Sequence, residues 1–417
     1  MQALIERIIQ KSPVAVMGYA LLENVFAPHK IDAIFRTHRV RQRERAWLFS
    51  SVVDLMTVVA CRIKPSIRAA YTEIQDSAPA SLDALYKKLD GIELGVSEAL
   101  VRETAKDMME IMQHVQPEAQ EIIPGYRSRL VDGNKLAATD RRLSVQRDQE
   151  AAPLPGFGLV VYEGGRSMIS EVLLCDDGHT QERKLLPRLI ELVEPNDLWF
   201  ADRNFCCSGY LHEIAQRQGF FVIRQHASTP WEPLDDLVFQ GETETGEVWE
   251  QRGIITNPET KKQLSVRRIE IRLKSQTRDG DEILSLFSNL PDEVSALVIA
   301  DSYRKRWRIE TAFQELEGLL SSEIQTLSYP PAALFAFSTA LVAYNILKCI
   351  ILSIETSQPE ESREISAYHV SHALSQTHVG LQLFTEAGDW EECQRWDASE
   401  IAGFLVCLGA QMKGVVA

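Results

Sequence analysis

Several features are scarce or missing in this sequence, and each absence excludes a class of protein. The chain has seven cysteines, an odd number, and no pair is spaced as Cys-x-x-Cys, which argues against both a disulfide framework and a zinc ribbon. Cys206 and Cys207 are adjacent, but nothing of metal-site spacing accompanies them. Basic residues are outnumbered, with 44 Lys and Arg against 59 Asp and Glu. The resulting net charge of −15 does not indicate a nucleic-acid-binding protein.

The sequence also lacks the apolar segments of a secreted or membrane protein. The opening residues MQALIERIIQKSP carry charges among their apolar positions and contain no signal-peptide core. The longest apolar stretch, residues 332–354, is interrupted by Lys348 and includes Asn345, which favours a buried core helix over a membrane span. We therefore expect a cytoplasmic protein without a membrane segment.

The charge that is present is unevenly distributed. Residues 1–75 hold eleven Lys and Arg against six Asp and Glu, whereas residues 355–417 hold three against ten. Four arginines alternate in the segment HRVRQRER, namely Arg39, Arg41, Arg43 and Arg45. This pattern is compatible with DNA contact near the N-terminus and an acidic tail, and equally with a solvated charge run.

The first part of the chain has the apolar spacing of helices. Helical spacing is present at residues 4–10, 16–26, 30–38, 43–63, 81–93 and 96–116. A helical N-terminal region over residues 1–123 is therefore predicted.

From Pro124 and Gly125 onward the pattern becomes that of strands and helices in alternation. Strands are predicted at 126–136, 157–165, 167–178, 197–205 and 219–227, with helices at 181–194 and 208–218. This order is the ribonuclease H-like order and predicts an α/β fold. Residues 237–256, 263–275 and 282–290 alternate like antiparallel strands, which predicts a β-rich insertion.

At 417 residues the chain is expected to hold two or three domains. We predict a ribonuclease H-like core in two parts, 124–228 and 293–355, split by the insertion at 229–292. A helical, acidic C-terminal tail is predicted at 356–417.

Residues 300–320 predict a single amphipathic helix with a polar row beside its apolar stripe. Tyr303, Arg306 and Glu310 fall at i, i+3 and i+7 and so share one face. Glu310 could be presented to a metal ion or a phosphate, although an ordinary solvated helix face has the same spacing.

Two upstream aspartates change this interpretation. Asp132 lies within the first predicted strand and Asp202 ends the fourth, and adjacent parallel strands would set them side by side. A helix across the sheet can bring Glu310 over them. Three converging carboxylates repel one another unless they are protonated or bind metal, and hard oxygen ligands favour Mg²⁺ or Mn²⁺. Two such ions can activate a nucleophile and stabilise the leaving oxygen at a phosphodiester.

On these residues the chain resembles the DDE transposases of bacterial insertion sequences, in the insertion-sequence-four family. The similar motifs are VDGNKL around Asp132, ADRNF around Asp202 and the helix signature Tyr-x2-Arg-x3-Glu-x6-Lys, which Tyr303, Arg306 and Glu310 match. The signature's lysine is absent, because position 317 is Glu317.

The resemblance implies binding of terminal inverted repeats, two divalent ions held by the three acids, and metal-dependent strand cleavage and strand transfer. It implies a homodimer on double-stranded DNA in a nucleoid-associated, cytoplasmic protein. Tyr303, Arg306 and the four N-terminal arginines are the expected DNA contacts. Two alternatives stay open: a metal-dependent nuclease that cuts without joining, and an inactive descendant that only binds DNA. Trp231, Trp249 and His226 are read as structural residues.

Overall fold

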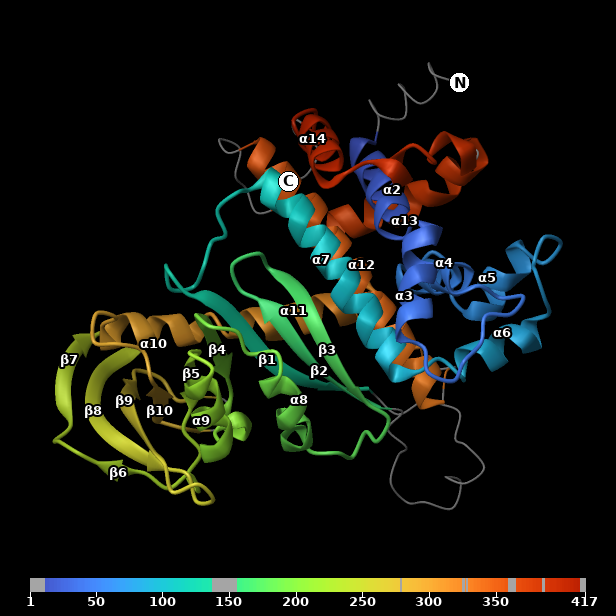
Figure 1. Cartoon of the computed structure of the whole chain (residues 1–417). Helices are drawn as coiled ribbons and strands as arrows, with labels where there is room; N and C mark the ends of the chain where they lie inside the picture. The colour runs from blue at the N-terminus through green and yellow to red at the C-terminus, as the bar shows by residue number, and fades with distance from the viewer. Residues whose placement is uncertain are drawn as a thin grey trace.

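The computed structural model describes residues 12–136, 156–277, 280–324, 327, 329–358, 365–384 and 387–412. The helix predicted at 4–10 lies outside these residues. Within them, ten strands form one sheet that runs from the middle of the molecule to one end (Figure 1).

The first five strands form the ribonuclease H-like part of the sheet. Their spatial order is β3-β2-β1-β4-β5; β1 is antiparallel to β2, β2 is antiparallel to β3, and β4 is parallel to both β1 and β5. Their bounds are Arg127–Lys135 (β1), Phe157–Glu163 (β2), Met168–Cys175 (β3), Asp197–Ala201 (β4) and Phe220–Arg224 (β5). The ribonuclease H-like α/β fold predicted from the sequence is therefore confirmed.

The β-rich insertion continues this sheet. Strand β10 pairs antiparallel with β5, β9 with β10, and β8 with β9, while β6 and β7 both pair with β8. The bounds are Glu232–Pro233 (β6), Val238–Glu242 (β7), Gly246–Thr256 (β8), Gln263–Leu273 (β9) and Ile283–Ser288 (β10). The insertion and the core thus share one hydrogen-bonded framework.

Alternation along the core strands separates two apolar layers. Leu198 and Phe200 of β4 face the larger core, which also contains the helices of both chain ends, whereas Trp199 and Ala201 face the smaller one. The smaller core is covered by α8 (Leu186–Ile190) and α9 (Ser208–Gln216). Successive side chains of a strand point to opposite faces, so the sequence of β4 dictates this division.

The larger core is built around two long helices that lie against each other, α7 (Leu94–Val115) and α12 (Pro330–Ser357). Helix α12 is long and apolar enough to cross a membrane, but 94% of its most apolar window is buried in the protein, as expected of a core helix. Asn345 of α12 both donates to and accepts from the backbone of Ile169 in β3. These bonds fix the edge of the sheet to the helices.

Most of the remaining helices of the larger core come from both ends of the chain, and Figure 1 shows them on the side of the molecule that holds α7 and α12. Their bounds are Pro13–Val25 (α2), Pro28–His38 (α3), Phe49–Ala60 (α4), Ile67–Glu73 (α5), Leu82–Leu89 (α6), Ala367–Phe384 (α13) and Ala398–Gly409 (α14). The helix predicted at 43–63 spans only Phe49–Ala60, and it follows a loop at residues 39–48 in which the N–H groups of Val40, Arg41 and Gln42 bond to the distant carboxylate of Glu93. The residue limits of the predicted domains stay predictions.

Candidate active site

Asp132 and Asp202 lie side by side on one face of the sheet. Strands β1 and β4 are parallel, and Leu130 pairs with Phe200. Asp132 lies two residues after Leu130, and Asp202 lies two residues after Phe200. Because side chains two residues apart along a strand point to the same face, both aspartates lie on the face where Leu130 and Phe200 enter the larger core. Both side chains are half-buried. The backbone N–H of Gly133 donates to Asp132 at 2.9 Å, and that of Asn204 donates to Asp202 at 2.8 Å.

Glu310 reaches this face on a separate helix. Helix α11 (Trp307–Leu319) buries Ile309, Ala312 and Leu316 in the same larger core and contacts β1. Between Asp132 and Glu310 lies Arg306, whose guanidinium donates to Asp132 Oδ2 at 3.4 Å and to Glu310 Oε1 at 2.5 Å. One cation therefore joins two of the three predicted catalytic acids.

The single helix predicted at 300–320 is wrong, because the chain forms two helices with a tight turn between them. Helix α10 (Ala296–Arg304) ends one turn before α11 begins. At the junction, the N–H groups of Lys305, Arg306 and Arg308 bond to carbonyls three residues back. In an α-helix each N–H bonds to the carbonyl four residues earlier, so this tighter turn interrupts the helix. Arg306 becomes the residue that precedes the first turn of α11.

Tyr303 and Arg306 are buried beside the acids. Only 8% of Arg306 and 7% of Tyr303 are exposed. The Tyr303 hydroxyl donates to the carbonyl of Ala201 at 3.4 Å, directly before Asp202, and burial raises its pKa to about 12. Arg306 Nε has no hydrogen-bond partner in the described part of the chain. Both side chains therefore serve the interior of the site in this structure, and their predicted DNA contacts stay predictions.

Burial and mutual repulsion make it unfavourable for all the acids of the site to be ionised at the same time. Burial raises the pKa of Asp132 to about 7, with further contributions from the carboxylates of Asp202 and Glu182, while Arg306 and the Gly133 N–H act in the opposite direction. A carboxyl with so high a pKa carries a proton or a counter-ion near neutral pH. The site thus favours an added positive charge.

Glu182 is a fourth carboxylate that the sequence interpretation missed. It begins the short 3₁₀ helix Glu182–Leu185, and Asn204 Nδ2 donates to it at 3.3 Å. Burial and the nearby Asp202 raise its pKa. A Cβ built on Gly133 would lie 2.5 Å from Glu182 Oε1. A glycine inside a strand often marks such a close approach, so Gly133 was the available signal.

The donor set fits a hard divalent cation in its chemistry. The acids of the site all offer carboxylate oxygens, the ligands that Mg²⁺ and Mn²⁺ prefer. Within the described residues, no three His, Cys, Asp or Glu side chains lie close enough to hold a metal ion. Arg306 occupies the position between Asp132 and Glu310 instead.

The other predicted residues lie away from these acids. Arg39, Arg41, Arg43 and Arg45 lie in or beside the loop between α3 and α4. Trp231 packs on Phe287, and Trp249 on Phe239, in agreement with structural roles. His226 accepts from the N–H of Ser228 in a turn.

No curated protein matches the sequence. Among solved structures, the chain is similar to one described as a cryo-EM structure of the piggyBac transposase synaptic complex with hairpin DNA. The identity is 10% and the TM-score 0.44, with 91% of this chain and 84% of that chain covered.

A family match covers part of the site. Residues 156–346 match the family described as the transposase DDE domain. This range contains Asp202, Arg306 and Glu310, together with Glu182, while Asp132 precedes it. The match supports a DDE transposase, with the family's domain lying over residues 156–346.

Proposed function

We propose that the chain is the transposase of an insertion sequence, of the insertion-sequence-four type, which cleaves DNA at terminal inverted repeats and transfers the cut strands. The observation that carries this proposal is the placement of Asp132 and Asp202 on adjacent parallel strands, with Glu310 tied to Asp132 through Arg306. These acids come from three segments that lie far apart in the sequence. A merely solvated set of acids would not require two aspartates on adjacent strands and a buried arginine between Asp132 and Glu310.

Asp132, Asp202 and Glu310 would hold two Mg²⁺ or Mn²⁺ ions, with Glu182 in reach of the same site. When bound, such ions supply an activated water or 3′-hydroxyl and stabilise the leaving oxygen of a phosphodiester. The elevated pKa of Asp132 supports this assignment, because burial leaves that carboxylate in need of positive charge.

The surrounding side chains position these acids and meet the DNA. Arg306 orients Asp132 and Glu310, and on release from them its guanidinium can hold a phosphate oxygen. Tyr303 holds the end of β4 through the carbonyl of Ala201. The N-terminal arginines, Arg39, Arg41, Arg43 and Arg45, would bind the backbone of the inverted repeat. Two ends must be held together for transfer, so a homodimer on double-stranded DNA is the proposed active form, in the cytoplasm at the nucleoid.

The test is cleavage of a labelled DNA that carries the flanking inverted repeat, with Mg²⁺ or Mn²⁺. Wild type is expected to nick at the repeat boundary, Asp202→Asn to lose nicking, and the control Asp236→Asn, at an exposed aspartate outside the site, to retain it. A joined product in a strand-transfer assay separates a transposase from a nuclease. Specific binding of the inverted repeat without cleavage in the presence of either metal would contradict the catalytic proposal and indicate a protein that only binds DNA.

A further inference from the structure

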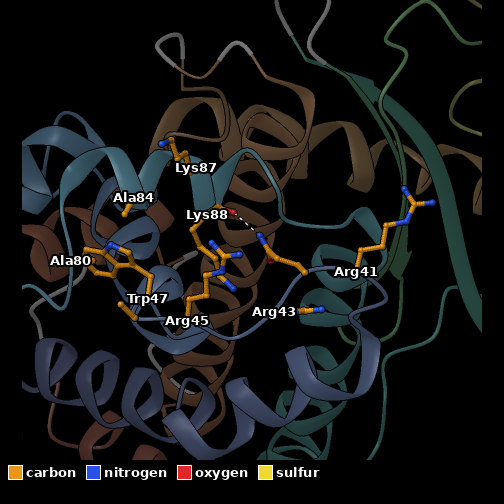
Figure 2. A pocket seen from close by; sticks show the side chains of 10 residues that line it. Arg41, Arg43, Arg45, Trp47, Ala80, Ala84, Lys87 and Lys88 are labelled. Atoms are coloured by element: carbon orange, nitrogen blue, oxygen red, sulfur yellow. Dashed lines mark hydrogen bonds between the residues drawn. The ribbon is translucent and has the colours of Figure 1, made fainter.

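The N-terminal helical region contains a pocket whose charge is wholly positive. It encloses about 410 Å³ between the loop 39–48 and helix α6. Figure 2 shows arginines from the loop on one side and lysines of α6 on the other. The ten lining residues are Arg41, Gln42, Arg43, Arg45, Ala46, Trp47, Ala80, Ala84, Lys87 and Lys88. Five of them are cationic and none is acidic, although the whole chain carries a net charge of −15.

Most of this charge is not neutralised by the protein. Arg43, Arg45 and Lys87 are exposed and form no ion pair with any residue that the structure describes. By contrast, the neighbouring Arg36 lies 3.5 Å from Glu44. Unpaired cations around a concavity concentrate positive potential there and attract anions.

Buried donors in the wall of the pocket also lack partners. Trp47 is 2% exposed and Lys88 is 7% exposed, and neither Trp47 Nε1 nor Lys88 Nζ has a hydrogen-bond partner among the described residues. The Lys88 ammonium lies 3.9 Å from the centroid of the Phe35 ring, which supplies no hydrogen-bond acceptor through lone pairs. Both nitrogens are closed off from solvent and so lie behind the surface of the pocket; the donors that a ligand can reach are the exposed side chains of Arg43, Arg45 and Lys87.

The loop that carries the arginines is held in place by one carboxylate. Glu93 accepts backbone N–H groups from Val40 at 2.6 Å, Arg41 at 2.5 Å and Gln42 at 2.8 Å. Gln42 Nε2 in turn donates to the carbonyl of Lys88 at 2.8 Å. The arginine side chains therefore project from a fixed backbone, which reduces the entropy lost when they bind a ligand.

We infer that this pocket binds a phosphate group of the DNA backbone, with Glu93 as the residue that positions the binding loop. Phosphate oxygens accept hydrogen bonds from guanidinium and ammonium groups, and exposed groups of both types, from Arg43, Arg45 and Lys87, line the pocket. This inference rests on the proposed function, because DNA is the partner that the proposed function requires. Free phosphate offers the same oxygens, and the experiment separates the two sources.

The test measures the affinity of the full-length chain for a labelled DNA duplex over a range of salt concentrations. The double variant Arg43→Gln/Arg45→Gln is expected to bind at least about tenfold more weakly at low salt. Its slope of log affinity against log salt should fall by about 0.9 for each phosphate that the variant no longer neutralises. Arg395→Gln, at an arginine that is 79% exposed in the C-terminal region, is the matched control and should leave affinity and slope as in wild type.

The Glu93→Gln variant tests whether Glu93 acts by positioning the loop 39–48 or only through its negative charge. Removal of one negative charge alone would tighten DNA binding. A loosened loop binds more weakly while the salt slope stays the same, because the cations are retained. Weaker binding at constant slope is therefore expected, and tighter binding would overturn the role of Glu93.

The failures of the two proposals are distinguishable. If the double variant binds and nicks DNA as wild type does, this inference fails together with the proposed DNA contacts of Arg43 and Arg45, while the proposed cleavage and strand transfer by the acids stand. Calorimetric binding of inorganic phosphate that the double variant loses, with DNA affinity unchanged, assigns the pocket to free phosphate and also overturns the inference. A wild type that binds no DNA removes the proposed function itself.

Discussion

Arg306 donates a 2.5 Å hydrogen bond to Glu310, four residues later, and the same guanidinium reaches Asp132 at 3.4 Å. The arginine thus acts as an internal counter-ion for two acids on different elements. With 10% of its side chain exposed, its charge is only weakly screened by solvent. Replacement of Arg306 should separate its role as a counter-ion to the acids from its proposed role in holding a phosphate.

We expect Arg306→Met to lower the free energy of unfolding by about 1–3 kcal/mol without metal, because two acids lose their counter-ion. Added Mn²⁺ should restore more stability to this variant than to wild type, since the cation replaces the missing positive charge. Urea unfolding with and without Mn²⁺ measures both effects. Arg304→Met is the matched control, because Arg304 pairs with the exposed Glu244. An equal response of wild type and Arg306→Met to Mn²⁺ would contradict the counter-ion role.

Gly133→Ala should destabilise the protein by about 1–3 kcal/mol, because the new methyl group overlaps Glu182 Oε1 and the Phe157 ring. Glu182→Ala in the same chain should recover part of that loss by removing one of the two overlaps. Gly209→Ala is the control, since its Cβ would meet nothing within 4 Å. Urea unfolding of the four proteins provides the measurement. A double variant no more stable than Gly133→Ala would show that Glu182 does not lie over the glycine.

Glu171→Gln should make stability less dependent on pH. Burial raises the pKa of Glu171 to about 7, against the opposing effect of Arg102 and Arg129. A carboxyl whose pKa is higher in the folded state stabilises the folded protein when it is protonated. This contribution is fully present below the unfolded pKa of 4.5 and is lost as the pH rises through the folded pKa of about 7. The free energy of unfolding of the variant should therefore be higher than that of wild type by up to about 3 kcal/mol at pH 8. This difference should shrink toward pH 4. Chemical unfolding across this range tests the sign, with the exposed Glu213→Gln as control.

Glu317→Lys should strengthen DNA binding and increase the salt slope by about 0.9 for one added phosphate contact. The backbone at this position is already fixed, because Arg62 donates to the carbonyls of Glu317 and Gly318 at 2.6 Å. A lysine at the C-terminal end of α11 is also favourable to the helix dipole. Glu391→Lys makes the same charge change at an exposed site on the C-terminal side. Equal gains from both variants would show that only the net charge matters.

The core strands could be predicted from the sequence because each one records its own burial. Strand β4, for example, is a short continuous apolar run that includes Leu198, Trp199 and Phe200, all of them fully buried, and such a run is a local pattern consistent with a buried strand. The side-by-side placement of Asp132 and Asp202 follows from the same strand order. Local pattern was therefore sufficient for the core strands and, with their order, for the placement of two of the acids, but it did not indicate that the insertion continues the core sheet.

The features that escaped prediction depend on residues distant in sequence. Residues 43–48 read as the start of the helix predicted at 43–63 but belong to a loop, and Glu93, more than fifty positions away, accepts the N–H groups of Val40, Arg41 and Gln42 in the first part of this loop. Arg306 lies at the break between α10 and α11 although its neighbours are good helix formers, and its guanidinium is bound to Asp132, which is far away in the sequence. No propensity of the local segment contains such long-range bonds.

The pairing of β10 with β5 has a mechanical consequence. Phe287 pairs with Ile223, and Ile223 pairs with Ala201, the residue before Asp202. The outer strands β8 and β9 are hydrogen-bonded through this ladder to the strand that ends at an acid of the site. The insertion is thus joined to the end of β4 by a continuous ladder of backbone hydrogen bonds, so a displacement of its outer strands reaches the backbone that positions Asp202.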